Sequence, residues 1–203
     1  DLLAEDADDS TRLPIMPRAL NDRLEHGMRG ADSMIVLASP EIGKTAFILT
    51  IACGLATRGH RVVIFNNEER IERLFMRAIS CITGLTTREV RENLTQARDM
   101  AMARGFDNLV FVAMSPGTPR QIDAELEKYP DAKLFIVDQL RNLTIRTENK
   151  TIQLEEAAKE IRNIAKRRHL VSIAVTQAGD SAEGKSILGM GDADGSNTGI
   201  PGA

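Results

Sequence analysis

The sequence predicts an α/β fold with a mostly parallel central sheet and helices on both of its faces. Five short apolar runs are too continuous for strands with one exposed face, which is typical of strands buried on both sides. These predicted strands cover residues 33–37, 61–65, 109–113, 133–137 and 171–175. Patterns with helical spacing separate most of them and cover residues 44–58, 71–82, 86–103, 118–129 and 151–168. The alternation of strands and helices favours a sheet covered by helices on both sides.

The composition indicates one globular domain behind an acidic leader. A hydrophobic content of 42% and a charged content of 27% are typical of soluble globular proteins, and 203 residues suit a single core. The first ten residues hold five acidic side chains and no basic one, and Pro14 and Pro17 follow. We therefore predict an acidic linker over residues 1–17 and one domain over residues 18–203, incomplete at its C-terminus. The body beyond the leader is nearly neutral, which argues against broad adhesion to nucleic acid but leaves room for a local basic groove or channel.

The chain carries no sign of export or of a membrane span. Its longest apolar runs fall short of the roughly 20 residues that a span needs, and an acidic start is the opposite of a signal peptide. Cys53 and Cys81 are the only cysteines and lack metal-like spacing, so we expect no disulfide and a reducing compartment. These features predict a soluble, intracellular protein without a membrane partner.

The segment at residues 38–45 reads A-S-P-E-I-G-K-T between a predicted strand and a predicted helix. It matches the P-loop pattern G-x-x-x-x-G-K-[ST] at Gly43, Lys44 and Thr45, while Ala38 replaces the first glycine and must use a backbone conformation open to alanine. In this pattern backbone N–H groups surround the phosphates, the lysine reaches the β- and γ-phosphates and the hydroxyl holds Mg²⁺. The sequence therefore predicts a P-loop NTPase that binds ATP and Mg²⁺; the alternative is an ordinary strand-to-helix turn with a surface lysine. The predicted nucleotide-binding residues are Ser39, Pro40, Glu41, Ile42, Gly43, Lys44, Thr45 and Ala46.

Polar residues at other strand ends extend this candidate site. Asp138 follows a buried apolar run and, with Thr45, is the candidate for holding Mg²⁺. Glu68 or Glu69 could orient the attacking water, although two acids at a helix start also suit the helix dipole. Gln177 ends the last predicted strand and could lie near the γ-phosphate, but the pattern alone favours an exposed strand end.

The order of these motifs resembles the RecA-like motor domain of DnaB-type replicative helicases, over about residues 20–203. The segments that carry the resemblance are residues 20–24 with Gly27 and Gly30, residues 38–45, residues 63–68 followed by Met76 and Arg77, residues 136–140 and residues 175–177. In that family alanine often replaces the first P-loop glycine. The resemblance implies a RecA-like P-loop NTPase fold in which Lys44, Glu68 and Gln177 are catalytic: Glu68 activates water and Gln177 senses the γ-phosphate.

The same resemblance implies an ATP-dependent DNA helicase motor. It implies a hexameric ring that couples ATP hydrolysis to translocation on single-stranded DNA and to duplex unwinding, with primase or other replisome proteins as partners, in the cytoplasm of a bacterium or of a phage-infected host. The terminal stretch resembles the loop that lines the ring's channel, although it carries no arginine. The residues expected to contact DNA are Lys185, Gly195, Ser196, Asn197, Thr198 and Gly199. An arginine finger from the adjacent subunit and an amino-terminal domain belong to the family and are expected outside this chain.

Two other functions remain open from the sequence. A RecA- or RadA-like recombinase shares these motifs but forms a filament for strand exchange. A loader or regulatory switch would bind ATP to change partners without translocation. Unwinding of a forked duplex separates the helicase from both.

Overall fold

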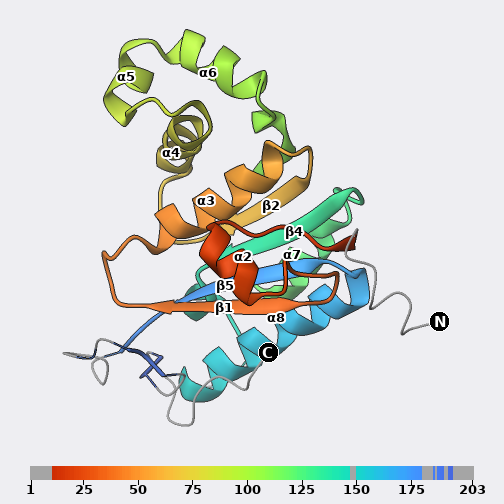
Figure 1. Ribbon diagram of the computed structural model, residues 1–203. Coiled ribbons are helices and arrows are strands. Elements are labelled where there is room, and N and C mark those ends of the chain that lie inside the picture. Colours follow the sequence, from red (N-terminus) through yellow and green to blue (C-terminus); the bar gives the residue numbers. More distant parts are fainter. Residues whose placement is uncertain (1–10, 147–149, 180–184, 186, 190–191, 194–203) are drawn as a thin grey trace.

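Five strands form one fully parallel sheet in the computed structural model of the protein, which describes residues 11–146, 150–179, 185, 187–189 and 192–193. The strands are β1 (Ser33–Ala38), β2 (Arg61–Asn66), β3 (Leu109–Ala113), β4 (Ala132–Asp138) and β5 (Val171–Gln177). Their order across the sheet is β1-β5-β4-β2-β3, and every neighbouring pair is parallel (Figure 1). The predicted α/β architecture is confirmed, and each predicted strand agrees with an observed one to within two residues at either end.

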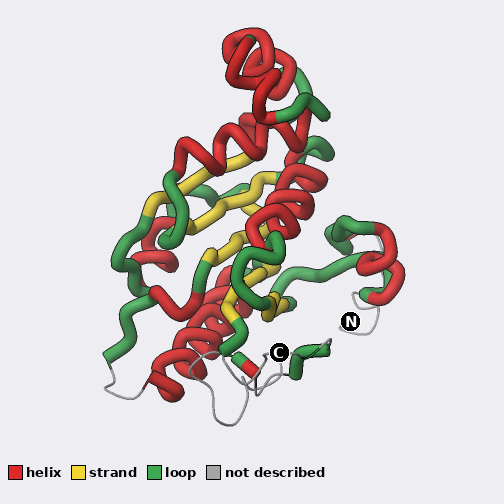
Figure 2. Tube along the Cα trace, turned by 90° about the vertical axis from the view of Figure 1, so that its left-hand side faces the viewer, coloured by secondary structure: helices red, strands yellow, loops and turns green. Residues whose placement is uncertain are grey.

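Helices cover both faces of the sheet, as Figure 2 shows. They are α2 (Arg18–Arg23), α3 (Lys44–Ala56), α4 (Ile71–Thr83), α5 (Thr87–Glu92), α6 (Leu94–Met102), α7 (Pro119–Leu126) and α8 (Lys150–Arg168), with the short 3₁₀ turns η2 (Phe106–Asn108) and η3 (Leu140–Asn142). Helix α3 packs on one face, and α4, α5 and α6 extend outward from it (Figure 1). Helices α7 and α8 cover the other face.

The strands supply alternate residues to two separate cores. In β2, Val62 and Ile64 face the core beneath α3, whereas Val63 and Phe65 face the core beneath α7 and α8. All four side chains are at most 1% exposed. This two-sided burial explains why the strands read as continuous apolar runs.

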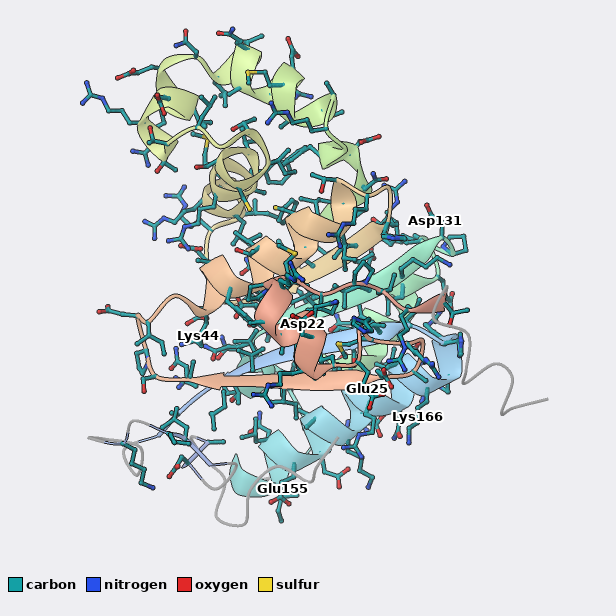
Figure 3. The ribbon with its side chains drawn as sticks, in the orientation of Figure 1. Asp22, Glu25, Lys44, Asp131, Glu155 and Lys166 are labelled. Carbon is teal, nitrogen blue, oxygen red and sulfur yellow. The ribbon has the colours of Figure 1, made fainter. Side chains whose placement is uncertain are left out.

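The parallel arrangement places the carboxyl ends of all five strands at one edge of the sheet. Lys44, which begins α3 directly after the β1 turn, lies at this edge, and Asp131, which precedes β4, lies at the opposite end (Figure 3). The chain leaves β1 for β2, but β5 and β4 lie between these two strands. Ligands of open α/β sheets bind in the crevice outside such carboxyl ends.

The amino-terminal segment joins the domain earlier than the sequence suggests. Residues 1–10 lie outside the described residues, but Leu13 and Ile15, within the predicted linker, are buried against the α3 core. Leu13 also exchanges two backbone hydrogen bonds with Met28, at 2.7 and 3.0 Å. Two apolar side chains spaced by two residues therefore anchor residues 11–17 to the fold.

The single helix expected over residues 86–103 is two helices. Thr86 begins α5 with a capping box, in which its hydroxyl accepts the Glu89 N–H and Glu89 accepts the Thr86 N–H. Asn93 has φ −135° and ψ 55°, which is not helical, and separates α5 from α6. The apolar spacing continues across this kink, so periodicity alone could not reveal it.

The described part of the chain contains no helix that is long and apolar enough to cross a membrane. Both cysteines are free thiols. The α3–α4 packing brings them together, and Cys53 is buried while Cys81 is exposed. Their hydrogen bond lowers the pKa of Cys81 to about 7 and raises that of Cys53.

Candidate nucleotide-binding site

The P-loop forms the turn between β1 and α3. Ala38 is the last residue of β1, pairs in register with Gln177 and does not adopt a positive φ. An alanine therefore fits where the pattern usually has glycine. Gly43 has φ 98° and a Cβ at this position would meet open space, so its requirement is conformational and not steric. The following helix α3 points its N-terminal N–H groups at the turn, which favours an anion there.

Lys44 and Thr45 are the first two residues of α3 and directly follow the loop. The Lys44 side chain is buried, and its Nζ donates to the Ser39 carbonyl oxygen at 3.2 Å. This contact folds the ammonium group back over the phosphate-binding turn. The Thr45 hydroxyl donates to Asp138 Oδ2 at 3.3 Å. This hydrogen bond joins two residues 93 positions apart that the sequence offers as candidates for holding Mg²⁺.

Asp138 is a buried carboxylate with spare acceptor capacity. It is 1% exposed, and its Oδ1 atom has no hydrogen-bond partner among the described residues. Burial, and then the nearby charge of Glu68, raise the pKa of Asp138 to about 6. A buried carboxylate oxygen without a donor, beside a hydroxyl, fits the oxygen ligands that Mg²⁺ prefers. The described residues contain no group of three or more His, Cys, Asp or Glu that could hold a metal ion, so the candidate Mg²⁺ site depends on Asp138 and the Thr45 hydroxyl alone.

Replacing Asp138 with asparagine should stabilise the nucleotide-free protein at neutral pH. The folded pKa of about 6 lies above the ordinary value of 3.8, so the ionised carboxylate costs stability as pH rises from about 4 to about 6. The raised pKa of Asp138 lowers the free energy of unfolding by about 1–3 kcal/mol at pH 7.5 and by less at pH 5, and the asparagine should recover this loss. Urea unfolding of Asp138→Asn at both pH values measures the gain.

The control for this substitution is Asp131→Asn, an exposed carboxylate at the opposite end of β4 that pairs with Arg61. It should leave the pH dependence of stability nearly unchanged, because an exposed pair contributes little. A lower stability of Asp138→Asn at pH 7.5 would contradict the inference that the ionised Asp138 carboxylate destabilises the nucleotide-free protein.

The structure separates the two glutamates that follow β2. Glu68 Oε1 accepts a hydrogen bond from Gln177 Nε2 at 3.1 Å, at the mouth of the P-loop. Glu69 instead turns toward α4, where it accepts from Arg73 and Arg77, both at 3.1 Å. Glu69 is therefore committed to two ion pairs, while Glu68 faces Asp138 closely enough to dominate the charge effect on its pKa.

Gln177 is held on both sides by charged residues. Its Nε2 donates to Glu68, and its Oε1 accepts from Arg141 Nη1 at 2.8 Å. Gln177 is the last residue of β5, and Arg141 lies in η3, just beyond β4. The sequence pattern alone favours a solvated strand end for Gln177, whereas the structure places its amide inside a charged network.

Two asparagines fix the loop that carries Glu68. Asn67 accepts the Gln139 N–H at 2.6 Å and donates to the Gln139 carbonyl at 3.0 Å, so it ties the end of β2 to the end of β4. Asn66 accepts the Glu69 N–H at 3.1 Å and also donates to the Glu69 carbonyl. The Asn67 bonds thus join the ends of β2 and β4 directly, and the Asn66 bonds hold the turn that contains Glu68.

The converging residues open into a cavity of about 940 Å³. It lies within the range of small-molecule sites, and it is lined by the P-loop, by Glu68 and Gln177, and by the α4 side chains Arg73, Arg77 and Cys81. Of the predicted nucleotide-binding residues, Pro40, Glu41, Gly43, Lys44, Thr45 and Ala46 line it. Ser39 contributes its carbonyl to Lys44, and Ile42 is 67% exposed at the tip of the turn.

Most of the predicted DNA-contacting residues lie outside the part of the chain that the structure describes. Gly195, Ser196, Asn197, Thr198 and Gly199 lie outside the described residues. Lys185 is described, and its Nζ forms an ion pair with Asp192 at 2.5 Å.

Some residues of this edge were not singled out from the sequence. Asn67 and Gln139 each lie two residues beyond the end of a predicted strand. A polar residue at that position indicates a place near the carboxyl ends of the strands, where ligands bind. Arg141 offered no such signal, because a single arginine after a strand is an ordinary surface residue.

The parallel sheet, the β1–α3 turn and the residues gathered around it define a RecA-like P-loop domain. Residues 18–187 match the family described as DnaB-like helicase C terminal domain, and the chain belongs to that family. The replicative DNA helicase DnaC of Bacillus subtilis (strain 168) is 28% identical over 175 residues, and replicative DNA helicase DnaB of Geobacillus stearothermophilus is 25% identical over 175 residues. Each match covers 80% of this chain but 38% of the relative.

Solved structures share the fold at lower sequence identity. A structure of a DnaB-like replicative helicase and its interactions with primase superposes with a TM-score of 0.80 at 18% identity, covering 96% of this chain and 52% of that one. The ATPase domain of G40P gives the same TM-score and identity, with 96% and 75% coverage. These similarities confirm the predicted RecA-like fold.

Proposed function

We propose that this chain is the ATP-hydrolysing motor domain of a replicative DNA helicase. The observation that carries the proposal is that Lys44, Thr45, Glu68 and Gln177 line one cavity, and that the buried Asp138 accepts a hydrogen bond from Thr45 beside it. Membership of the DnaB-like family and the helicase names of the relatives support the reaction. The chain spans 38% of the length of those relatives, so we propose, by similarity to them, the helicase activity of the whole protein.

The residues divide the work of phosphoryl transfer to water. The P-loop N–H groups and Lys44 bind the phosphates, and Thr45 with Asp138 would hold Mg²⁺, whose charge neutralises the phosphate oxygens when it is bound. Glu68 orients the attacking water and accepts its proton. Gln177 has two N–H donors on Nε2, of which one binds Glu68 and the other is free to bind a γ-phosphate oxygen.

The finer parts of the proposal concern DNA and assembly. We infer a hexameric ring that translocates on single-stranded DNA, with Lys185 and residues 195–199 as the candidate DNA contacts and with primase as a candidate partner. The structural relative described with its interactions with primase supports that last expectation. The expected arginine finger from a neighbouring subunit would complete each site.

Unwinding of a forked DNA duplex by the full-length protein tests the helicase function. We expect strand separation that requires ATP and Mg²⁺, and preferential binding of single-stranded over duplex DNA. Electron microscopy with nucleotide and single-stranded DNA should show a six-membered ring. A filament with strand-exchange activity would indicate a recombinase, and nucleotide-dependent partner binding without translocation would indicate a switch or loader.

A further inference from the structure

The contact between Arg141 and Gln177 resolves an ambiguity in the Gln177 side chain. A glutamine amide presents an acceptor oxygen on one side and an NH₂ donor on the other, and a half-turn exchanges them. An arginine guanidinium only donates and an ionised carboxylate only accepts. Arg141 at 2.8 Å and Glu68 at 3.1 Å therefore select a single orientation, with Oε1 toward Arg141 and Nε2 toward the P-loop side.

This orientation determines what a bound nucleotide meets. If the amide turned over, its oxygen would face Glu68 and the γ-phosphate, and both are acceptors with negative charge. Glu68 alone would not fix the orientation, because a movement of its carboxylate would release the amide. Arg141 holds the amide from the opposite side, through a bond assisted by the guanidinium charge.

We infer that Arg141 is a positioning residue that lets the site distinguish nucleoside triphosphate from diphosphate, by fixing the Gln177 NH₂ group toward the γ-phosphate. This inference rests on the proposed function of the cavity as a nucleotide site. Arg141 itself does not line the cavity, so it acts through Gln177. It also connects the γ-phosphate to η3, the turn that leads out of the Asp138 strand.

The test compares affinities for the non-hydrolysable triphosphate AMP-PNP and for ADP, both with Mg²⁺, by calorimetry on the full-length protein. The preference is the ADP dissociation constant divided by the AMP-PNP dissociation constant. Arg141→Met should lower this preference by about 3- to 10-fold, the effect of one exposed charge-assisted hydrogen bond, with ADP affinity unchanged. Arg141→Lys keeps a donor and should retain part of the preference. Arg146→Met, another exposed arginine of the same segment, is the matched control and should change nothing.

A double-mutant cycle separates positioning from a direct charge effect. In a Gln177→Ala background, Arg141→Met should have no further effect on the preference. An unchanged preference in Arg141→Met, or an equal loss with and without Gln177, would overturn the inference while leaving the proposed function intact. Failure of the unaltered protein to bind either nucleotide would overturn both. Unchanged ADP affinity in Arg141→Met and Arg146→Met shows that these two exposed substitutions do not disturb the fold.

Discussion

Glu68→Gln should abolish nearly all ATP hydrolysis while leaving ATP binding intact. Glutamine keeps the size of the side chain but cannot accept the proton of the attacking water, and loss of a general base costs about 10²- to 10⁴-fold in rate. Steady-state phosphate release by the full-length protein measures the loss, and a filter-binding assay with labelled ATP measures retained affinity. This substitution has the largest expected effect on the rate of hydrolysis because it removes the general base, while the residues that bind the phosphates stay in place.

Its matched control is the adjacent Glu69→Gln. Glu69 already forms ion pairs with Arg73 and Arg77, so it is unavailable to water, and its change should lower the rate by less than about tenfold. The opposite ranking, with Glu69→Gln nearly inactive and Glu68→Gln active, would transfer the water-orienting role to Glu69.

Lys44→Ala should weaken the binding of Mg²⁺–ATP by about 30- to 1,000-fold. The buried Lys44 ammonium is already directed over the phosphate-binding turn by the Ser39 carbonyl, so its loss removes a charge contact that is largely preorganised. Removing one member of a buried charge pair costs on the order of 2–4 kcal/mol of binding free energy. Isothermal calorimetry gives the affinity directly.

Lys133→Ala provides the comparison for Lys44. Lys133 is an exposed lysine near the amino end of β4, at the sheet edge opposite the P-loop, and its removal should leave the affinity within about twofold. Affinity that survives Lys44→Ala would show that the phosphates bind elsewhere, even though the fold remains RecA-like.

The strands and the main site residues could be predicted because they depend on local signals. Strands buried on both faces produce continuous apolar runs, and the polar residues that end β2, β4 and β5 mark the carboxyl ends of the strands. Asp138 follows this rule, Thr45 is located by the P-loop pattern, and their hydrogen bond shows that the two residues meet. The P-loop was recognisable because its spacing is set by the phosphate it surrounds.

Other features depend on contacts between distant segments, which local patterns do not record. The choice between Glu68 and Glu69 is decided by Gln177 on one side and by α4 arginines on the other. The Asn67–Gln139 connection joins residues 72 positions apart. The kink at Asn93 leaves the apolar spacing intact, so the sequence pattern continues through it.

The pairing of β1 with β5 has a consequence for biosynthesis. Ser33 lies opposite Ser172, 139 positions later in the chain, and β5 is the strand that β1 pairs with among the described residues. At about 5–20 residues per second, a ribosome needs roughly 7–28 s to travel between them. The strand β1, which leads into the P-loop, is thus synthesised before the other strands but gains its partner β5 last. A nascent chain that stops before β5 cannot assemble the pocket. Prematurely terminated products would compete poorly for nucleotide with the finished protein.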